Sequence, residues 1–237
     1  MNSRLRHSVE LRKEYIGSKS KKVRTEIPYL FSDSPLIRES VAGYPNSSFN
    51  DTFKGLLRPS VNLKEFIESS FKEKKGQLIG VEFGGPGNNL FGGFKEGTFD
   101  QTISIHLGGT NTKLPHHSII QGDIFDPKMY AELNARLNGR RPDIIFSRLH
   151  GGLGYIPQNY EILKSAFRKW YRILNIEGIM FVQVYYTASS SMVNQEGAIS
   201  ELRSLHSANP QAFDLVVNDS ERVFYIKKHQ EVEFRKK

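Results

Sequence analysis

Cysteine is absent from the 237 residues, which excludes disulfide bonds, thiolate metal ligands and a cysteine nucleophile. A chain without disulfides needs no oxidising compartment, so we expect a cytoplasmic protein. No apolar run approaches the roughly 18 residues of a membrane-spanning helix, and the first residues form no apolar core like that of a signal peptide. The length favours one domain with a sizeable core and an appendage.

Acidic residues are fewer than basic ones, but the excess of +8 lies at the two ends of the chain. Residues 1–24 hold eight lysines and arginines against two glutamates, and residues 227–237 hold five against two. The body between these ends is close to neutral. Two explanations of the charged ends stay open. They can bind RNA phosphates or an anionic surface, or they can simply be solvated, which is the commoner case.

Composition divides the chain into four parts. Residues 1–24 are a basic N-terminal tail and residues 229–237 a basic C-terminal tail. Residues 25–60 are irregular and rich in proline and in aromatic side chains, which lose burial energy if left in water. We expect this segment to lie across the main domain, as a lid or as plain packing. Residues 61–228 carry the strand and helix patterns of an α/β domain.

The most informative stretch is residues 77–89, QLIGVEFGGPGNN. Apolar β-forming residues run to Phe83 and stop at a loop that contains Gly84, Gly85 and Gly87. This pattern predicts a buried strand and a loop whose backbone approaches a ligand, although glycine turns after strands are common and most only turn the chain. The loop lacks G-x-G-x-x-G spacing, which makes a dinucleotide dehydrogenase a weak alternative.

Strand and helix patterns alternate through the rest of the domain. Helical spacing occurs in four segments: residues 63–71, with Ser60 as the expected N-cap, 130–137, 160–174 and 198–207. Strand patterns occur in residues 78–83, 102–107, 118–121, 143–149 and 179–186, and residues 213–217 and 222–227 predict a terminal hairpin. We expect an open α/β sheet whose site lies along the carboxyl edge of its strands.

This order resembles the class I S-adenosylmethionine-dependent methyltransferases, a Rossmann-like family with a doubly wound, mostly parallel seven-stranded sheet and a C-terminal antiparallel hairpin. Residues 82–89 resemble the family's first motif, an acidic residue before a glycine loop. Residues 122–125, GDIF, resemble the segment that holds adenine. Residues 172–180 resemble the helix end and turn into the fifth strand. The likeness covers residues 60–228.

The resemblance implies an enzyme that binds S-adenosylmethionine and transfers its methyl group to an acceptor. The glycine loop approaches the methionine part of the cofactor, and Asp123 accepts a hydrogen bond from the adenine amino group. The cofactor-binding residues that it implies are Glu82, Gly84, Gly85, Gly87, Asp123, Ile124 and Phe125.

One histidine is the candidate catalytic residue. His150 follows the fourth predicted strand, where the resemblance places the transferred methyl group, and imidazole suits a general base at neutral pH. A histidine in a surface loop is the plain alternative. No metal site is expected, because His116 and His117 are adjacent and face opposite ways on a strand.

The chain departs from the family pattern in three places. Its glycine loop is one residue shorter than the common form. The family's acidic residue at the end of the second strand, which binds ribose, is missing, and His106 or Asn111 is the candidate substitute. No N/D-P-P-Y/F sequence follows the fourth strand, which argues against the enzymes that use it to methylate amino groups of adenine, cytosine or glutamine.

Three functions stay open from the sequence. A methyltransferase acting on a small molecule or a protein side chain is favoured, because the body is neutral. An RNA-directed methyltransferase would use the basic tails to hold phosphate groups. A catalytically inactive relative would keep the fold as a binding scaffold, for which the missing acidic residue is the sign.

Overall fold

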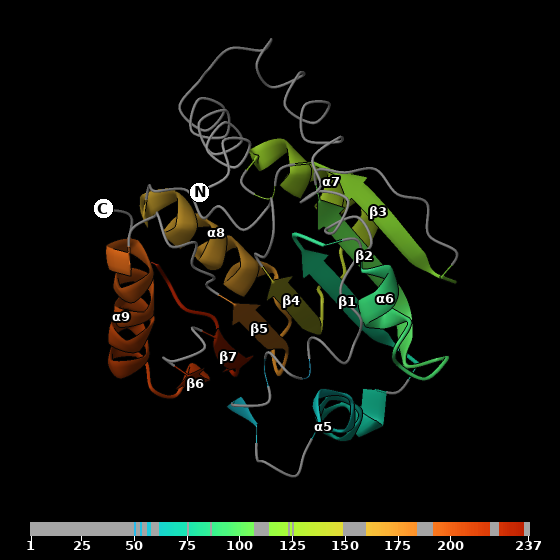
Figure 1. Cartoon of the computed structure of the whole chain (residues 1–237), viewed down its shortest axis with the longest axis horizontal. Coiled ribbons are helices and arrows are strands. Elements are labelled where there is room, and N and C mark those ends of the chain that lie inside the picture. The colour runs from blue at the N-terminus through green and yellow to red at the C-terminus, as the bar shows by residue number, and fades with distance from the viewer. Residues whose placement is uncertain are drawn as a thin grey trace, which may run out of the picture.

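The computed structural model describes residues 50, 53, 56–57, 62–74, 76–85, 87–106, 114–122, 124, 126–148, 160–183, 192–218 and 223–234. These residues form a sheet with helices on both of its faces (Figure 1). The predicted lid or packing segment is described only at residues 50, 53 and 56–57, and the N-terminal tail lies outside the described residues.

Seven strands make one sheet. They are β1 (Leu78–Phe83), β2 (Phe99–His106), β3 (His117–Gln121), β4 (Ile144–Arg148), β5 (Ile179–Gln183), β6 (Phe213–Asn218) and β7 (Val223–Lys228). Their order across the sheet is β3-β2-β1-β4-β5-β7-β6. The first five strands pair in parallel, and β7 pairs antiparallel with both β5 and β6. The expected mostly parallel sheet with a terminal antiparallel hairpin is therefore confirmed.

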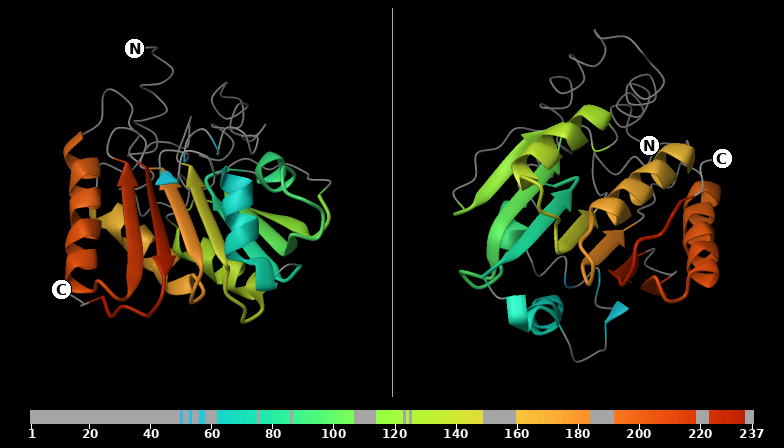
Figure 2. Two further views of the ribbon diagram at one scale, coloured as in Figure 1. Left: turned by 90° about the horizontal axis from the view of Figure 1, so that it is seen from below. Right: turned by 180° about the vertical axis from the view of Figure 1, so that it is seen from behind.

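Helices connect these strands and cover both faces of the sheet. They are α5 (Leu63–Ser70), the short 3-10 turn η2 (Lys72–Lys74), α6 (Asn88–Phe91), α7 (Pro127–Leu137), α8 (Tyr160–Ile173) and α9 (Met192–Ala208). In the left view of Figure 2, α5 (cyan) lies on one side of the sheet and α8 (gold) on the other. The doubly wound arrangement follows from right-handed crossovers between parallel strands.

The sheet divides the hydrophobic core into two layers. Alternate residues of the central strands, such as Val81 and Ile103, pack with α7, α8 and α9 in the larger cluster. On the opposite face, Phe146 of β4 and Phe181 of β5 pack with α5, α6 and the buried Phe53 in the smaller one. Trp170 of α8 lies at the centre of the larger cluster, stacked 4.8 Å from Phe83, with its indole N–H donating to the Tyr130 hydroxyl at 2.8 Å.

The ends of two helices differ from the sequence interpretation. The N-cap of α5 is Asn62, whose side chain accepts from the backbone N–H of Glu65 at 2.9 Å, so Ser60 was the wrong residue. The side chain of an N-cap residue accepts from the second or third backbone N–H of the helix. Ser60 lies two residues before Asn62, too early in the chain to take this position. Helix α7 ends as predicted, with Asn138 in the left-handed conformation.

The described part of the C-terminal tail contacts the body. Val232 is buried in the larger core cluster, and the Phe234 ring meets Tyr171 of α8 edge-on at 5.7 Å. The domain boundaries stay predictions, but residues 229–234 pack against α8 and the segment before β6.

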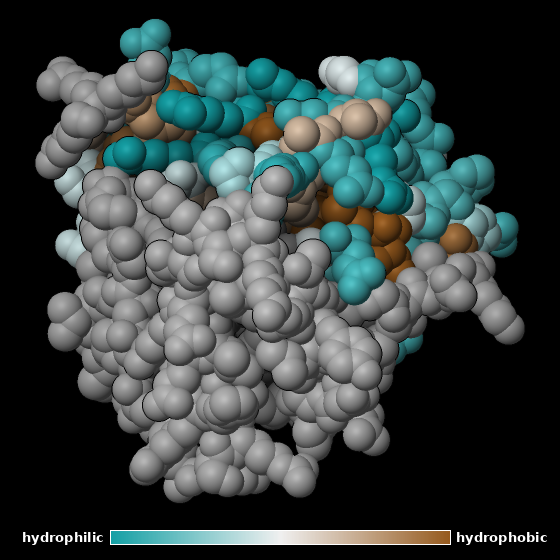
Figure 3. Space-filling model, turned by 90° about the horizontal axis from the view of Figure 1, so that it is seen from above, coloured by the Kyte–Doolittle hydropathy of each residue, from teal (hydrophilic) through white to brown (hydrophobic). Residues whose placement is uncertain are grey.

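The surface of the described residues is mainly hydrophilic on the side shown in Figure 3. Among the described residues, the exposed large hydrophobic side chains are Ile176 and Val216. A search of the same residues finds no helix with the length and apolar character needed to cross a membrane.

Candidate functional site

The carboxyl ends of the parallel strands meet at one edge of the sheet, and the glycine loop follows β1 at this edge. Gly84 and Gly87 have φ values of +93° and +72°, which favour glycine because other residues are strained there. The backbone N–H of Gly84 donates to the carbonyl of Ile105 at 2.8 Å, so the loop is tied to the end of β2. The position of the loop is therefore fixed by β1 and β2.

The side chains of Glu82 and Ser104 occupy the space that a side chain at two of the loop glycines would need. A Cβ atom at Gly85 would stand 2.3 Å from a carboxylate oxygen of Glu82, and one at Gly87 would stand 1.9 Å from the Ser104 hydroxyl oxygen. Real Cβ atoms essentially never lie within 3.0 Å of such an atom, so one of the two must shift. A side chain at Gly85 would force the Glu82 carboxylate to move, and one at Gly87 would clash with Ser104 and also be strained by its φ of +72°.

Glu82 is buried, with 2% of its surface exposed, and its carboxylate lies against Gly85. It belongs to the sheet face that α5 and α6 cover, because its neighbours Val81 and Phe83 face α7 and α8. Its carboxylate therefore lies next to the loop, and its contact with a cofactor stays a prediction.

A cluster of polar side chains on β2 and β3 packs against the loop at Gly87. Thr102 and Ser104 point to the same face of β2, and both bond to the ring of His117 on β3, at 2.7 and 3.2 Å. The ring of Phe91 in α6 lies 5.8 Å from the His117 ring. The sequence interpretation missed this cluster, although polar residues at every second position of a central strand were a visible signal.

His106 ends β2 on the same face as Thr102 and Ser104. It is 1% exposed, and among the described residues neither ring nitrogen has a hydrogen-bond partner. Burial, with a smaller contribution from His117, lowers the pKa of His106 to about 4. The imidazole is therefore uncharged at neutral pH.

The segment predicted to hold adenine begins beside His106. The backbone N–H of Gly122 donates to the carbonyl of His106 at 2.9 Å, and Ile124 is buried in the larger core cluster. The hydroxyl of Tyr130 donates to the carbonyl of Ile124 at 3.0 Å. Ile124 thus packs in the core beside α7, and its contact with a cofactor stays a prediction.

Several predicted site residues lie outside the described residues, namely Asp123, Phe125, His150 and Asn111. The structure brings the glycine loop, Glu82 and the start of the 122–125 segment to one edge of the sheet. No group of three or more metal-ligating side chains occurs in the part of the chain that the structure describes.

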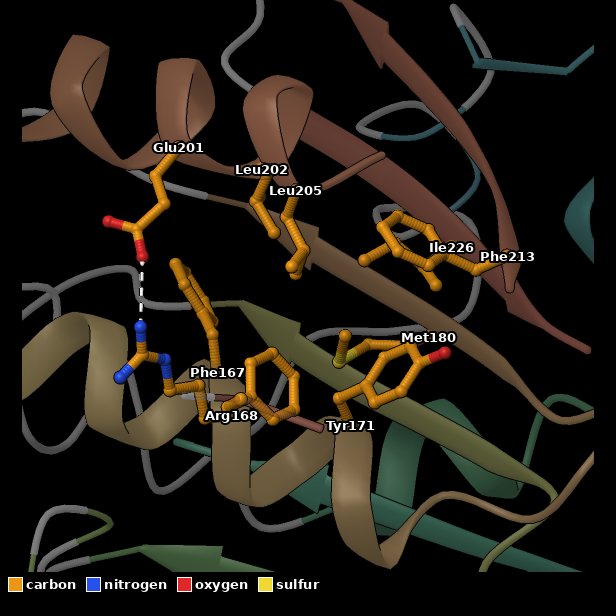
Figure 4. A pocket seen from close by; sticks show the side chains of 10 residues that line it. Phe167, Arg168, Tyr171, Met180, Glu201, Leu202, Leu205, Phe213 and Ile226 are labelled. Carbon is orange, nitrogen blue, oxygen red and sulfur yellow. Dashed lines mark hydrogen bonds and ion pairs between the residues drawn. The ribbon is translucent and has the colours of Figure 1, made fainter. Parts of the chain in front are cut away.

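A separate apolar pocket lies between α8, α9 and the sheet (Figure 4). Phe167, Leu202 and Phe213 are among the side chains that line it, and an ion pair of 3.3 Å between Arg168 and Glu201 crosses from one helix to the other. Its volume of about 30 Å³ holds one or two water-sized groups. The pocket is too small for a nucleoside, so it is a gap in the packing of the two helices.

No family model and no curated protein matches the chain. Solved structures do resemble it. MycE methyltransferase from the mycinamycin biosynthetic pathway, crystallised with Mg and SAH, is 13% identical with a TM-score of 0.48, and the match covers 79% of this chain and 49% of that chain. The chain thus spans about half the length of that protein.

Two further solved structures match nearly over their full length. An rRNA methylase from Streptococcus thermophilus is 10% identical with a TM-score of 0.45, and the match covers 70% of this chain and 96% of that one. The N-methyltransferase NodS from Bradyrhizobium japonicum is 10% identical with a TM-score of 0.42, and the match covers 84% of this chain and 99% of that one. At these identities the similarity is one of overall fold.

Proposed function

We propose that the protein is an S-adenosylmethionine-dependent methyltransferase that binds its cofactor at the carboxyl edge of β1 and β2. The observation that supports this proposal most strongly is the glycine loop after β1, which lies next to buried polar side chains in a sheet of order β3-β2-β1-β4-β5-β7-β6. Ligands of open α/β sheets bind outside the carboxyl ends of the strands where the strand order reverses, and β1 lies between β2 and β4 at that reversal.

The described residues fit an adenosyl group on a physical criterion. The buried ring nitrogens of His106 have no partner among the described residues, and unpartnered buried polar atoms are uncommon unless a ligand or a water binds them. Gly84 and Gly87 of the loop have positive φ values, and the N–H of Gly84 bonds to the carbonyl of Ile105, the residue before His106. An adenosyl group offers both the hydroxyl groups and the flat ring that such a polar edge receives.

The sulfonium of the bound cofactor supplies an already activated methyl group, so the protein mainly has to bind, orient and exclude water. In this proposal the backbone of Gly84, Gly85 and Gly87 approaches the methionine part. Asp123 accepts from adenine, with Ile124 and Phe125 beside its ring. His150 removes a proton from the acceptor.

For the acceptor, a small molecule or a protein side chain is favoured, because the positive charge of the chain is concentrated at its ends. An RNA acceptor is the alternative that those basic ends support. Deletion of residues 1–24 distinguishes the two, since RNA binding through these residues would depend steeply on salt and would be lost with them. A binding scaffold without activity is the third reading.

Isothermal titration of the purified full-length chain with S-adenosylmethionine and S-adenosylhomocysteine tests the proposal. We expect binding of one molecule per chain with a micromolar dissociation constant, close to −8 kcal/mol as an order of magnitude. No heat of binding at millimolar ligand would contradict the enzyme and leave only the scaffold.

A further inference from the structure

The imidazole of His117 on β3 is held by two hydroxyl groups of the neighbouring strand β2. Its Nδ1 lies 2.7 Å from the Thr102 hydroxyl oxygen, and its Nε2 lies 3.2 Å from the Ser104 hydroxyl oxygen. A hydroxyl group both donates and accepts, so these two hydrogen bonds form with either tautomer of the ring. Because hydrogen bonds are directional, they fix the orientation of the imidazole.

The imidazole fixed in this way lies against Gly87 in the glycine loop. A Cβ atom at Gly87 would stand 2.7 Å from Cε1 of His117, and the Ser104 hydroxyl fills the same space. Phe91 of α6 adds a third contact, because its ring borders this space and its backbone N–H donates to the Gly87 carbonyl at 2.8 Å. Gly87 has no side chain of its own, so these contacts determine where this part of the loop lies.

Filling the space beside the loop would not by itself require polar side chains. Ser104 is paired in one row across the sheet with Glu82, Phe146 and Phe181, and on β4 and β5 this row is aromatic. Thr102 and Ser104 are 4% and 0% exposed, and burial of a hydroxyl group costs free energy unless the group is hydrogen-bonded. The hydroxyl groups add a fixed direction, which apolar packing does not supply. Binding sites need this kind of support, because the groups that contact a ligand must be held in one geometry.

We propose that His117 is a positioning residue for the cofactor: with Thr102 and Ser104 it holds the glycine loop at Gly87 and so sets the affinity for the amino-acid part of an adenosyl compound. The inference rests on the proposed function, which assigns the backbone of this loop to the methionine part of the cofactor. In this role His117 acts through the loop and does not touch the ligand.

Two ligands of the full-length chain test this role by calorimetric titration. S-adenosylhomocysteine carries a nucleoside and an amino-acid part, and 5′-methylthioadenosine carries the same nucleoside without the amino acid. We expect the natural chain to bind S-adenosylhomocysteine at least tenfold more tightly. His117→Phe keeps a ring beside Phe91 but removes both hydrogen bonds. It should bind S-adenosylhomocysteine about tenfold more weakly and 5′-methylthioadenosine as the natural chain does.

This pair of ligands separates positioning from a general loss of stability. A destabilised fold would bind both compounds more weakly by the same factor, whereas a displaced loop weakens only the compound with the amino-acid part. His117→Gln keeps an amide donor and acceptor that can still bond Ser104, so it should retain most of the preference. Ser104→Ala removes the hydroxyl beside Gly87 and should lose the preference as His117→Phe does.

His116→Asn is the matched control. His116 is the neighbouring exposed histidine, and its φ of 56° is a conformation that asparagine tolerates. Its replacement should change neither the affinity for S-adenosylhomocysteine nor that for 5′-methylthioadenosine.

The other outcomes overturn the role of His117. If His117→Phe and Ser104→Ala keep the natural preference, or if they weaken both compounds equally, the network supports the fold and not the loop's contact with the ligand. A natural chain that binds the two compounds equally well shows that the loop does not contact the amino-acid part, which also overturns this inference and leaves an adenosyl site standing. A natural chain that binds neither compound overturns the proposed function and this inference together.

Discussion

The two faces of the sheet are built from alternate residues of the same strands, but they bury different kinds of side chain. On the face under α7 and α8, β1 and β2 present Val81, Phe83, Ile103 and Ile105. On the opposite face the same two strands bury polar residues, which are Glu82, Thr102, Ser104 and His106. At β1 and β2, therefore, only the first face has the composition expected of a core.

On this face the buried polar residues gather on β1 and β2, with Gln183 at the end of β5 as a further one. On β4 and β5 the same face carries Phe146 and Phe181, whose rings stack 5.6 Å apart, in the smaller hydrophobic cluster. Buried polar groups destabilise a fold unless they are hydrogen-bonded, so a polar region next to an aromatic one needs a purpose. We infer that β1 and β2 both stabilise the fold and form part of a ligand site, whereas β4 and β5 mainly stabilise the fold.

The largest expected effect tests the apolar face. Trp170→Ala removes a fully buried ring that stacks on Phe83 and donates to Tyr130, so we expect a loss of about 3–5 kcal/mol in the free energy of unfolding. Urea denaturation measures it, with the exposed Ser165→Ala on the same helix as a control that should change little. A loss below about 1 kcal/mol would show that this face is not the main core.

Gly87→Ala probes the polar face. The substitution combines strain at φ of +72° with a clash against the Ser104 hydroxyl, and we expect a loss of about 2–4 kcal/mol. Gly97→Ala is the matched control, because Gly97 has φ of +74° with open space around it, and it should lose only about 1 kcal/mol. Equal losses in the two variants would mean that Ser104 does not pack against the loop.

Lys228→Met tests how the apolar face treats a buried charge. The ammonium of Lys228 satisfies two carbonyls at the C-terminal end of α8, and the substitution leaves them without a donor. We expect a loss of about 2–3 kcal/mol in the free energy of unfolding. A Lys228→Met chain as stable as the natural one would remove the contrast between a partnered and an unpartnered buried group.

The smallest effect concerns pH at the hairpin edge, far from the proposed site. The His229 ring contacts Glu177 at 2.8 Å and Asp214 at 3.1 Å, and the bond to Glu177 is the main cause of its raised pKa. The pKa of Glu177 is lowered, first by His229 and then by Lys227. Because the pKa of His229 is raised, its protonated ring stabilises the folded chain fully at pH values below the ordinary 6.5. This contribution is lost as pH rises through the folded-state pKa.

The lowered pKa of Glu177 works in the other direction, since its contribution is present above the ordinary value of 4.5 and is lost as pH falls through the folded-state pKa. The stability difference between the natural chain and His229→Gln should therefore be largest between about pH 5 and 6.5 and decline toward pH 8. Partial exposure keeps it below about 1 kcal/mol. A difference that grows with pH would reverse the assignment.

Much of the fold could be predicted, because local periodicity decided it. The three- and four-residue steps of α8 and the apolar run of β1 are signals within single segments. Boundaries were less accurate: β2 begins at Phe99, three residues before the prediction. Phe99 and the polar Gln101 pair with β1, and Asp100 lies at the register shift between them. Helix α7 begins at Pro127, after the Asp126 cap, a start signal that was overlooked.

The site was predictable only in part, because its contacts join distant segments. The glycine loop was visible in the sequence, but the presence of Ser104 and Glu82 in its open spaces depends on pairing between β1 and β2. Lys228 stands at the edge of a basic C-terminal region, and only its place under the end of α8 explains its burial. The burial of His106 likewise arises from the assembled sheet and could not be predicted from its neighbours in sequence.

The central claim is that the polar end of β1 and β2 is a ligand site, whereas the apolar face is core. Amide NMR spectra of the full-length chain during a titration with S-adenosylhomocysteine test it most directly. The account predicts shifted signals for Gly84, Gly85, Gly87, His106 and Gly122, with unchanged signals along β6 and β7. Shifts concentrated around the pocket between α8 and α9, or no shift at saturating ligand, would contradict it.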